Sequence, residues 1–318
     1  MTTLASLSLC AAPRFALAQS VYAEDMATSP AVNVLRGQEQ WGTHRISWTL
    51  YGTSPQRLEQ VLKQLRAQWQ SEAQWLYTLP NDSKTSGARQ DLLKTLKNGC
   101  RNTAGALNPL DFSLREAWGF TPQSLSYRVP TAQERARLSQ QLSQWGCEGI
   151  AFSQPLTLDY FAAGWLVDQS KPLLTSKGVS AARLQIDDVA YYAGVPPQAE
   201  AWKVPVYHPR KAETLIQYFY LKDQALMMLG DATSHFYVNG VRFPDFVDAR
   251  TGGVHEESAG AYVLSSSALA AQLLARGSVL LEKEPLKAWV QQSLPGTRLI
   301  RWQEQLEQLV PQNFQAAS

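Results

Sequence analysis

Residues 239–243 read NGVRF, and residues 247–252, a few positions later, read VDARTG. Asp and Gly are favoured in tight turns because of their backbone preferences, so the second stretch predicts a hairpin turn. A turn of this composition is common in proteins and identifies no function by itself. Its meaning depends on the stretches that accompany it along the chain.

Four further stretches precede this one. They are residues 105–109 (GALNP) with 117–120 (AWGF), residues 164–168 (GWLVD), residues 202–210 (WKVPVYHPR) and residues 229–231 (LGD). In these residues the chain resembles the ApbE family of FAD:protein FMN transferases, over roughly residues 40–285. Each motif alone is weak, but several motifs in the expected order are a strong signal.

The resemblance implies an α+β fold with mixed, mostly antiparallel sheets and packed helices. It also implies a reaction in which the FMN half of FAD is transferred to a Thr or Ser hydroxyl of a target flavoprotein, with release of AMP. This is phosphoryl transfer, so catalysis is mainly positioning and charge neutralisation, and family members use Mg²⁺ for that charge. FAD, Mg²⁺ and an acceptor flavoprotein are therefore the expected cofactors and partners.

The resemblance also assigns roles to individual residues. Catalysis falls to Asp248, Thr251 and Asp245, of which Asp248 is expected nearest to the acceptor hydroxyl. Flavin binding falls to a larger set, which is Ala106, Leu107, Asn108, Thr157, Ala163, Gly230 and Asp231.

Several of these positions depart from the family pattern. Thr157 stands where members carry an acidic residue, Ala163 where they carry lysine, and Asp245 where they carry histidine. Loss of activity would produce such substitutions, and so would an altered activity. The alternatives to transfer are a flavin- or partner-binding protein without turnover, and hydrolysis of FAD to FMN and AMP.

The family's Mg²⁺ ligand positions fall at Gln272 and Arg276. Residues four apart lie on one face of a helix, but a neutral amide is a poor ligand for a hard cation and a guanidinium repels it. The sequence therefore makes Mg²⁺ binding doubtful. Arg276 can pair with Asp245, bind a phosphate in place of the cation, or lie in solvent, and these possibilities stay open.

Composition excludes some classes of function. The 318 residues carry 29 basic and 27 acidic side chains, a net charge of +2, which is no footprint for nucleic acid. No segment after the N-terminus has the run of about 20 apolar residues that a transmembrane helix needs. The four histidines are His44, His208, His235 and His255. They lack the HxH or HExxH spacing of a zinc site.

The N-terminus predicts a signal-like or leader segment over residues 1–25, with a small-x-small pattern at residues 16–18 (ALA), followed by a single domain over 26–318. Export to the periplasm is the expected location, and the cytoplasm is the alternative. In an oxidising compartment Cys100 and Cys147 can pair, although two buried free thiols fit the sequence equally well.

Apolar periodicity predicts the local elements. Residues 42–51 alternate like a strand after a polar leader, and a helix follows from near Pro55. Thr131 and Glu134 form a capping box for a helix over 131–145, with Trp145 in its buried stripe. Shorter patterns predict strands at 182–186, 202–207, 216–221 and 262–264, and helices near 160–177 and 266–282. No regular strand–helix alternation is present, which favours α+β over a doubly wound sheet.

Overall fold

The computed structural model describes residues 32–41, 44–78, 87–121, 124–232, 234–305 and 308–316. The expected leader at residues 1–25 lies outside them. Val32–Ser318 form one compact unit.

Strands and helices alternate irregularly along this unit. Among the described residues the strands are β1 (Asn33–Trp41), β2 (His44–Gly52), β3 (Val179–Ile186), β4 (Val189–Gly194), β5 (Trp202–His208), β6 (Lys211–Leu221), β7 (Gln224–Gly230), β8 (His235–Val238), β9 (Val241–Pro244), β10 (Ser258–Ser265), β11 (Arg298–Gln305) and β12 (Gln308–Gln315). The helices are α1 (Pro55–Thr78), α2 (Gly87–Asn102), α3 (Phe112–Trp118), α4 (Ala132–Trp145), α5 (Ala162–Leu174), α6 (Ala268–Ser278) and α7 (Lys283–Gln291), with a short 3₁₀ turn, η1 (Leu158–Tyr160).

Eight of the described strands form one sheet in the order β1-β2-β3-β4-β7-β10-β11-β12. Every neighbouring pair in it is antiparallel. The hairpins β5–β6 and β8–β9 stand outside this sheet. A doubly wound fold needs parallel strands, so the predicted α+β class with mostly antiparallel strands is confirmed.

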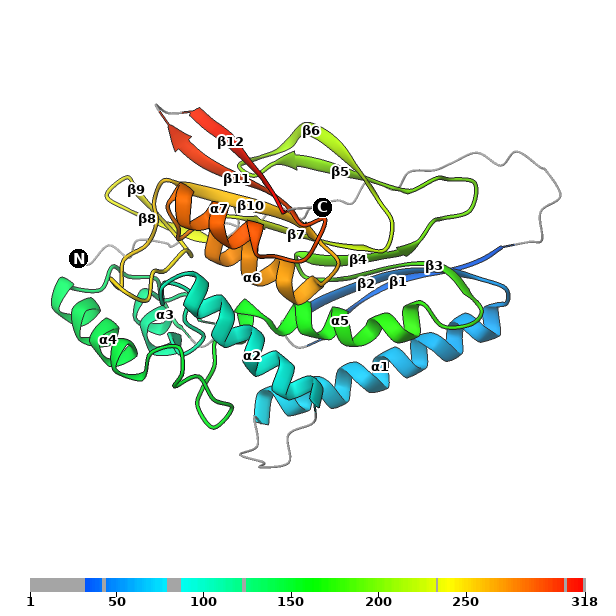
Figure 1. Cartoon of the computed structure of the whole chain (residues 1–318), viewed down its shortest axis with the longest axis horizontal. Coiled ribbons are helices and arrows are strands. Elements are labelled where there is room, and N and C mark those ends of the chain that lie inside the picture. Colours follow the sequence, from blue (N-terminus) through cyan, green and yellow to red (C-terminus); the bar gives the residue numbers. More distant parts are fainter. Residues whose placement is uncertain are drawn as a thin grey trace, which may run out of the picture. The chain divides into compact units, whose positions relative to one another are not determined.

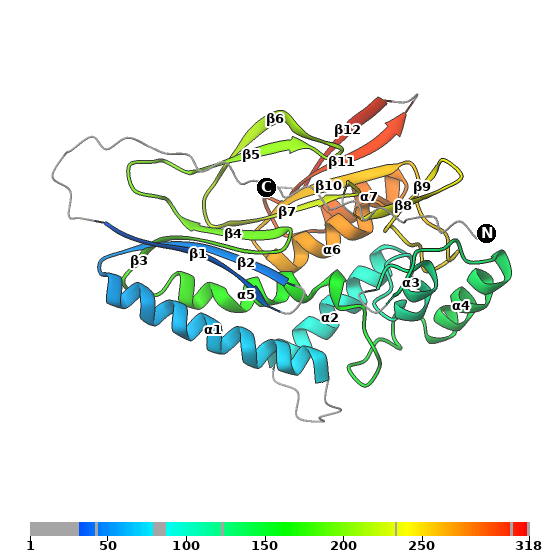
Figure 2. The ribbon, with the colours of Figure 1, turned by 180° about the vertical axis from the view of Figure 1, so that it is seen from behind.

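The sheet separates two hydrophobic layers. Helices α1, α5 and α6 lie along one face, and the β5–β6 hairpin lies over the other (Figures 1 and 2). The larger core, between helices and sheet, contains Leu50, Leu65 and Leu166, whereas the smaller core under the hairpin contains Val206 and Leu221. Burial on both faces holds the sheet as the scaffold for the site.

Two of the helix predictions are confirmed at their N-termini. Helix α1 begins at Pro55, a residue favoured in the first helical position. Helix α4 follows Thr131, whose hydroxyl accepts the Glu134 N–H at 3.2 Å. The prediction for Trp145 is wrong, because its side chain at the end of α4 is 49% exposed.

The second half of the polar segment before residue 42 is a strand, which the sequence did not predict. It forms β1, which pairs along its whole length with β2. Its side chains alternate between half-buried and exposed. An edge strand that has the core on one face and solvent on the other needs few apolar residues.

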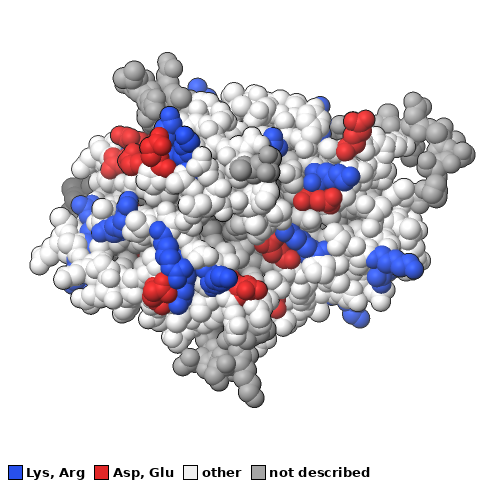
Figure 3. Space-filling view, viewed as in Figure 1, with Lys and Arg blue, Asp and Glu red and all other residues white. Residues whose placement is uncertain are grey.

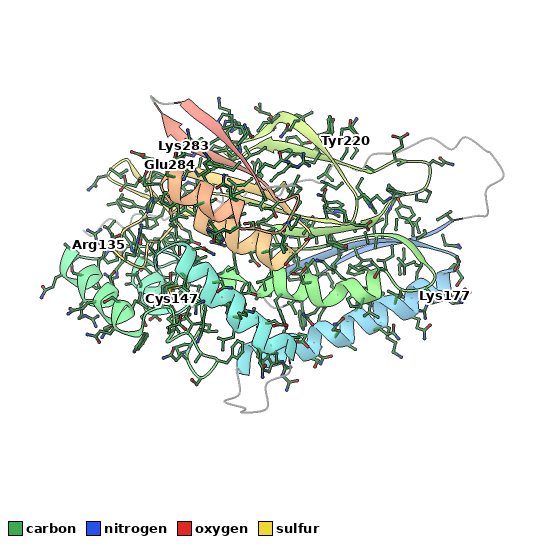
Figure 4. All side chains as sticks on the ribbon, in the orientation of Figure 1. Arg135, Cys147, Lys177, Tyr220, Lys283 and Glu284 are labelled. Carbon is green, nitrogen blue, oxygen red and sulfur yellow. A yellow bond between two sulfur atoms is a disulfide. The ribbon has the colours of Figure 1, made fainter. Side chains whose placement is uncertain are left out.

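Cys100 and Cys147 form a disulfide, so the possibility of two free thiols is excluded. The bond ties α2 to the segment after α4, and Figure 4 labels Cys147 beside α2. Because α2 leads directly into residues 105–109, the crosslink fixes the start of a predicted flavin-binding loop.

Charged side chains are scattered over the face shown in Figure 3 without a large patch of one sign. Within the described ranges, none of the helices has the length and apolar character needed to cross a bilayer.

Candidate functional site

Segments far apart in the chain meet at one small cavity. They are the loop after α2, the η1 turn, the connection after β9, and α6 with the residues that follow it. They supply the lining residues Leu107, Tyr160, Asp245, Phe246, Val247, Arg276 and Leu280. The cavity has a volume of about 10 Å³, room for about one water molecule. Side chains of the protein therefore nearly fill this space.

Asp245 is the centre of the charged groups at this cavity. Arg115, on α3, donates to both of its carboxylate oxygens, at 2.5 and 2.9 Å. The Ser234 hydroxyl adds a hydrogen bond at 3.2 Å, and an Arg276 nitrogen lies 3.7 Å from Asp245 Oδ2. Arg115 and Asp245 are both buried. Charge-assisted, two-pronged pairs of this kind are the strong ones.

Both arginines lie close to the ring of Tyr160. The guanidinium carbon of Arg115 is 5.2 Å from the ring centroid, and that of Arg276 is 5.7 Å away. Arg115 also lies 3.4 Å from Asp159. Burial alone lowers the pKa of Arg115, but Asp245 and the other acidic groups around it together outweigh burial and raise that pKa well above its usual value. Arg115 is therefore a permanent cation.

Asp111 is a second carboxylate close to Arg115 and Tyr160. It accepts hydrogen bonds from the Thr157 hydroxyl at 2.6 Å and the Tyr160 hydroxyl at 2.5 Å. Burial raises the pKa of Asp111 to about 6, against the opposing effect of Arg115. Thr157, a predicted flavin-binding residue, is thus engaged in holding Asp111 and Tyr160 in place.

The 247–252 stretch forms the predicted hairpin turn. The Asp248 N–H donates to Gly253 O at 2.8 Å, and the Gly252 N–H donates to Asp248 O at 2.7 Å. Gly252 has a φ of +69°, which glycine adopts without strain. The Thr251 hydroxyl accepts the Gly253 N–H, so this residue faces its own turn.

Asp248 is held by two neighbours within the turn. Arg250 donates to its carboxylate at 2.6 Å, and His255 Nε2 lies 3.3 Å from it. Burial works to raise the pKa of Asp248, but the hydrogen bonds from His255 and Arg250 outweigh it and hold that pKa well below the usual range. Asp248 is an ionised carboxylate at neutral pH, in contact with an imidazole.

This turn packs on the predicted flavin-binding loop. The Ala249 N–H donates to Ala106 O at 3.0 Å, and the Trp118 indole donates to Gly252 O at 2.8 Å. Leu107 lines the cavity, and the Asn108 side chain accepts the Leu110 N–H. Loop and turn are therefore one unit, although they are far apart in sequence.

Two other predicted flavin-binding residues form a separate cluster. Gly230 ends β7, and Asp231, which is fully buried, accepts from Arg210 at 2.8 Å and Arg242 at 3.0 Å. The last member of the predicted set, Ala163, is buried in the first turn of α5. The ion pairs of Asp231 with Arg210 and Arg242 connect β-strand segments and thereby stabilise the fold.

A model of the ApbE family matches residues 43–300 of the chain. The chain belongs to the ApbE family. A curated relative, an FAD:protein FMN transferase of Vibrio cholerae, is 26% identical over 191 residues. That alignment covers 57% of this chain and 57% of the relative.

Solved ApbE structures share the fold. The apo form of the flavinyl transferase ApbE of Pseudomonas stutzeri has a TM-score of 0.70 at 19% identity, covering 89% of this chain and 95% of that one. The flavin transferase ApbE of Vibrio cholerae has a TM-score of 0.69 at 16% identity, covering 89% and 98%.

The Mg²⁺ that the ApbE resemblance implies does not fit the residues present. Gln272 and Arg276 both lie on α6 as predicted, but both amide atoms of Gln272 are engaged. Its oxygen accepts the Gly164 N–H at 2.7 Å, and its nitrogen donates to Asp159 O at 3.0 Å. Among the described residues, no group of three His, Cys, Asp or Glu side chains is arranged to hold a metal.

The gap between α5 and α6 is closed at this point. A Cβ atom at Gly164 would lie 2.7 Å from Leu269 Cα, so only glycine permits this approach of the two helices. Arg276 lies one turn after Gln272 on α6. It lines the cavity together with Val247, the neighbour of Asp248. Helix α6 and the start of the 247–252 turn therefore meet at this cavity.

Some residues of the candidate site were not predicted. Arg115 and Asp111 belong to one stretch, residues 110–120 (LDFSLREAWGF), in which charged residues stand among apolar ones at helical spacing. That pattern signals buried charges, which must be paired. His255 carries no such signal, because only the fold of the turn brings it to Asp248.

Proposed function

We propose that the chain is an FAD:protein FMN transferase, which moves FMN from FAD onto a Thr or Ser of a target flavoprotein. The observation that carries the proposal is the junction of the 105–109 loop with the Asp248 turn, in a chain whose family match spans residues 43–300. A flavin-binding loop and a proton-accepting turn joined in this way meet the need of phosphoryl transfer for fixed positions.

In the proposed reaction one bond to phosphorus forms and one bond to the same phosphorus breaks. The acceptor hydroxyl oxygen attacks the phosphorus of the FMN half of FAD. A new P–O bond forms, the P–O bond to the AMP phosphate breaks, and AMP leaves with the bridging oxygen. The hydroxyl proton passes to a base of the protein.

Asp248 and His255 are the groups that we propose for the base. An isolated carboxylate with a pKa as low as that of Asp248 is a weak base, but it orients an imidazole well. His255, 3.3 Å from Asp248 and partly exposed, is in reach of solvent and of an incoming hydroxyl. Asp245 and Thr251 then have positioning roles. Asp245 holds Arg115 in place, and Thr251 holds the turn that carries Asp248.

The periplasm is the location that we propose. The Cys100–Cys147 disulfide favours an oxidising compartment, where such bonds persist. The partners are then FAD and an exported flavoprotein with an exposed Thr or Ser.

A second function is favoured by one observation. Arg276 and Asp245 lie 3.7 Å apart, and both line a cavity with space for about one water molecule, which suits a binding protein that has lost turnover. FAD hydrolysis, with water as the acceptor, is a third outcome of the same chemistry.

Incubation with FAD and an acceptor flavoprotein distinguishes these functions. Covalent flavin fluorescence on the denatured acceptor, together with AMP release, is the result that transfer predicts. AMP without labelled acceptor indicates hydrolysis, and bound flavin without either product indicates a binding protein. The Asp248→Asn variant is expected to bind FAD like the wild type and to label the acceptor at least tenfold more slowly, a conservative value for loss of acid–base catalysis.

A further inference from the structure

We propose that the Arg276 guanidinium, in place of a divalent cation, supplies the positive charge that binds the diphosphate of FAD in this site. The identity of the ligand as FAD rests on the proposed function. The charge, the geometry and the expected independence from metal rest on residues of this chain.

Arg276 has hydrogen-bonding capacity that the protein leaves unused. Its side chain is 15% exposed, and its Nε is buried without an acceptor in the part of the chain that the structure describes. The Asp245 carboxylate lies 3.7 Å from its guanidinium, beyond hydrogen-bond distance, and the face of Tyr160 is also close. Its charge also acts on the carboxylate of Asp188. A guanidinium has five N–H donors in a planar fork that matches phosphate oxygens.

Asp245 does not depend on Arg276 for its charge balance. Arg115 already donates to both carboxylate oxygens, and Ser234 donates a further hydrogen bond. Removing the sole partner of a buried charge is strongly unfavourable, but Asp245 keeps its main partner when Arg276 turns away. Arg276 can therefore exchange a long contact with Asp245 for short hydrogen bonds to a ligand.

The backbone position of Arg276 is fixed by the contacts of helix α6. Helix α6 starts at a firm cap, in which Asp168 accepts the Ala268 N–H at 2.9 Å and the Leu269 N–H at 3.0 Å. One turn before Arg276, Gln272 ties the same helix to Gly164 and Asp159. The charge at this point of the site thus comes from a positioned side chain and needs no bound ion.

Arg276 makes fewer hydrogen bonds than the buried arginines of the region, although Arg115 also has a buried Nε without an acceptor among the described residues. Arg115 is engaged by Asp245, Asp159 and the Phe120 carbonyl. Arg301, also buried, donates to the Ser278 and Leu281 carbonyls and to Gln312. Those contacts hold elements together, whereas the Arg276 head group faces the cavity.

Flavin binding measured by fluorescence tests this inference. FAD and riboflavin, which lacks phosphate, are titrated into the wild type, Arg276→Ala, Arg276→Lys and the control Arg298→Ala, each with EDTA and with Mg²⁺. Arg298 is an exposed arginine on β11, outside the site. Circular dichroism establishes that each variant is folded, and Arg276→Lys keeps a charge at the position if Arg276→Ala does not fold.

The wild type and Arg298→Ala are expected to bind FAD equally well in EDTA and in Mg²⁺. Arg276→Ala should weaken FAD binding by roughly 10- to 100-fold, the range for loss of a hydrogen bond to a charged group, and leave riboflavin binding unchanged. Arg276→Lys should fall between them.

Two results overturn the inference while the proposed function stands. They are wild-type FAD binding that requires Mg²⁺, and an Arg276→Ala variant that binds FAD as tightly as the wild type or more tightly, as expected if Arg276 only closes the site. A wild-type protein that binds neither FAD nor riboflavin overturns the proposed function together with the inference.

Discussion

Arg115 and Asp245, which are 130 residues apart in the chain, form a buried ion pair with two hydrogen bonds of 2.5 and 2.9 Å. The pair connects α3 to the segment after β9, and so fixes the distance between the proposed flavin-binding loop at residues 105–109 and the Asp248 turn.

Asp245→Ala is expected to lower the free energy of unfolding by about 3–5 kcal/mol, because it leaves the buried Arg115 charge without its main partner. Urea denaturation at pH 7 measures the change. The control is Glu39→Gln, which breaks the exposed Arg66–Glu39 pair and should cost at most about 1 kcal/mol. Equal effects of the two substitutions would show that the buried pair does not hold the site.

The disulfide makes a second prediction about stability. It closes a loop of 47 residues between Cys100 and Cys147, for which the lost chain entropy corresponds to roughly 4 kcal/mol. The Cys100→Ser/Cys147→Ser protein, compared with the oxidised wild type by urea denaturation, should lose stability of this order. Dithiothreitol should lower the melting temperature of the wild type and leave that of the double variant unchanged. A wild type insensitive to reduction contradicts a stabilising role.

Asp111 predicts a dependence of stability on pH. Burial raises its pKa to about 6 from the ordinary 3.8, so the folded state holds this proton more tightly than the unfolded chain does. The free energy of unfolding should therefore fall as the pH rises from about 4 to about 6, by roughly 3 kcal/mol at most. Asp248 acts in the opposite direction and at lower pH, because its pKa lies below the usual range.

The Asp111→Asn variant separates this contribution from others. Its free energy of unfolding, measured in urea at intervals between pH 4 and 7, should vary less with pH than that of the wild type. Parallel curves for the two proteins would mean that Asp111 is not the titrating group.

Mg²⁺ should leave the melting temperature unchanged at constant ionic strength, since neither Gln272 nor Arg276 suits the cation. A ligand that binds only the native state adds about 2.7 kcal/mol at a hundredfold excess over its Kd, an effect easily seen in a thermal scan. The Gln272→Asp/Arg276→Thr variant, which restores the family's ligand types, should gain a Mg²⁺ response. A Mg²⁺-dependent rise in the wild type, absent with NaCl, refutes the lost metal site.

Local sequence patterns predicted those parts of the fold that local interactions determine. The Thr131 cap and the apolar stripe of α1 depend on residues within a few positions of each other, and both are present. The β1 strand was missed because its edge position leaves half of its side chains exposed and polar. Trp145 was placed in the core by its spacing alone, although it lies where α4 ends and the surface begins.

The candidate site could be predicted in its residue types but not in its pairings. The substitutions at Asp245 and Arg276 were visible in the sequence, and the structure adds that an Arg276 nitrogen lies 3.7 Å from Asp245 Oδ2. The stronger partner of Asp245 is Arg115, which no spacing rule connects to it because the two residues are 130 positions apart. The Asp248–His255 contact was hidden for a related reason, since it depends on the course of a turn.

A crystal structure of the protein grown with both FAD and Mg²⁺ tests the central claim most directly. The account predicts an Arg276 nitrogen at about 2.7–2.9 Å from a diphosphate oxygen, the range for charge-assisted hydrogen bonds, with the Arg115–Asp245 pair intact and no cation on the diphosphate. A diphosphate held through a Mg²⁺ ion, or an Arg276 still paired with Asp245 while FAD binds elsewhere, would contradict it.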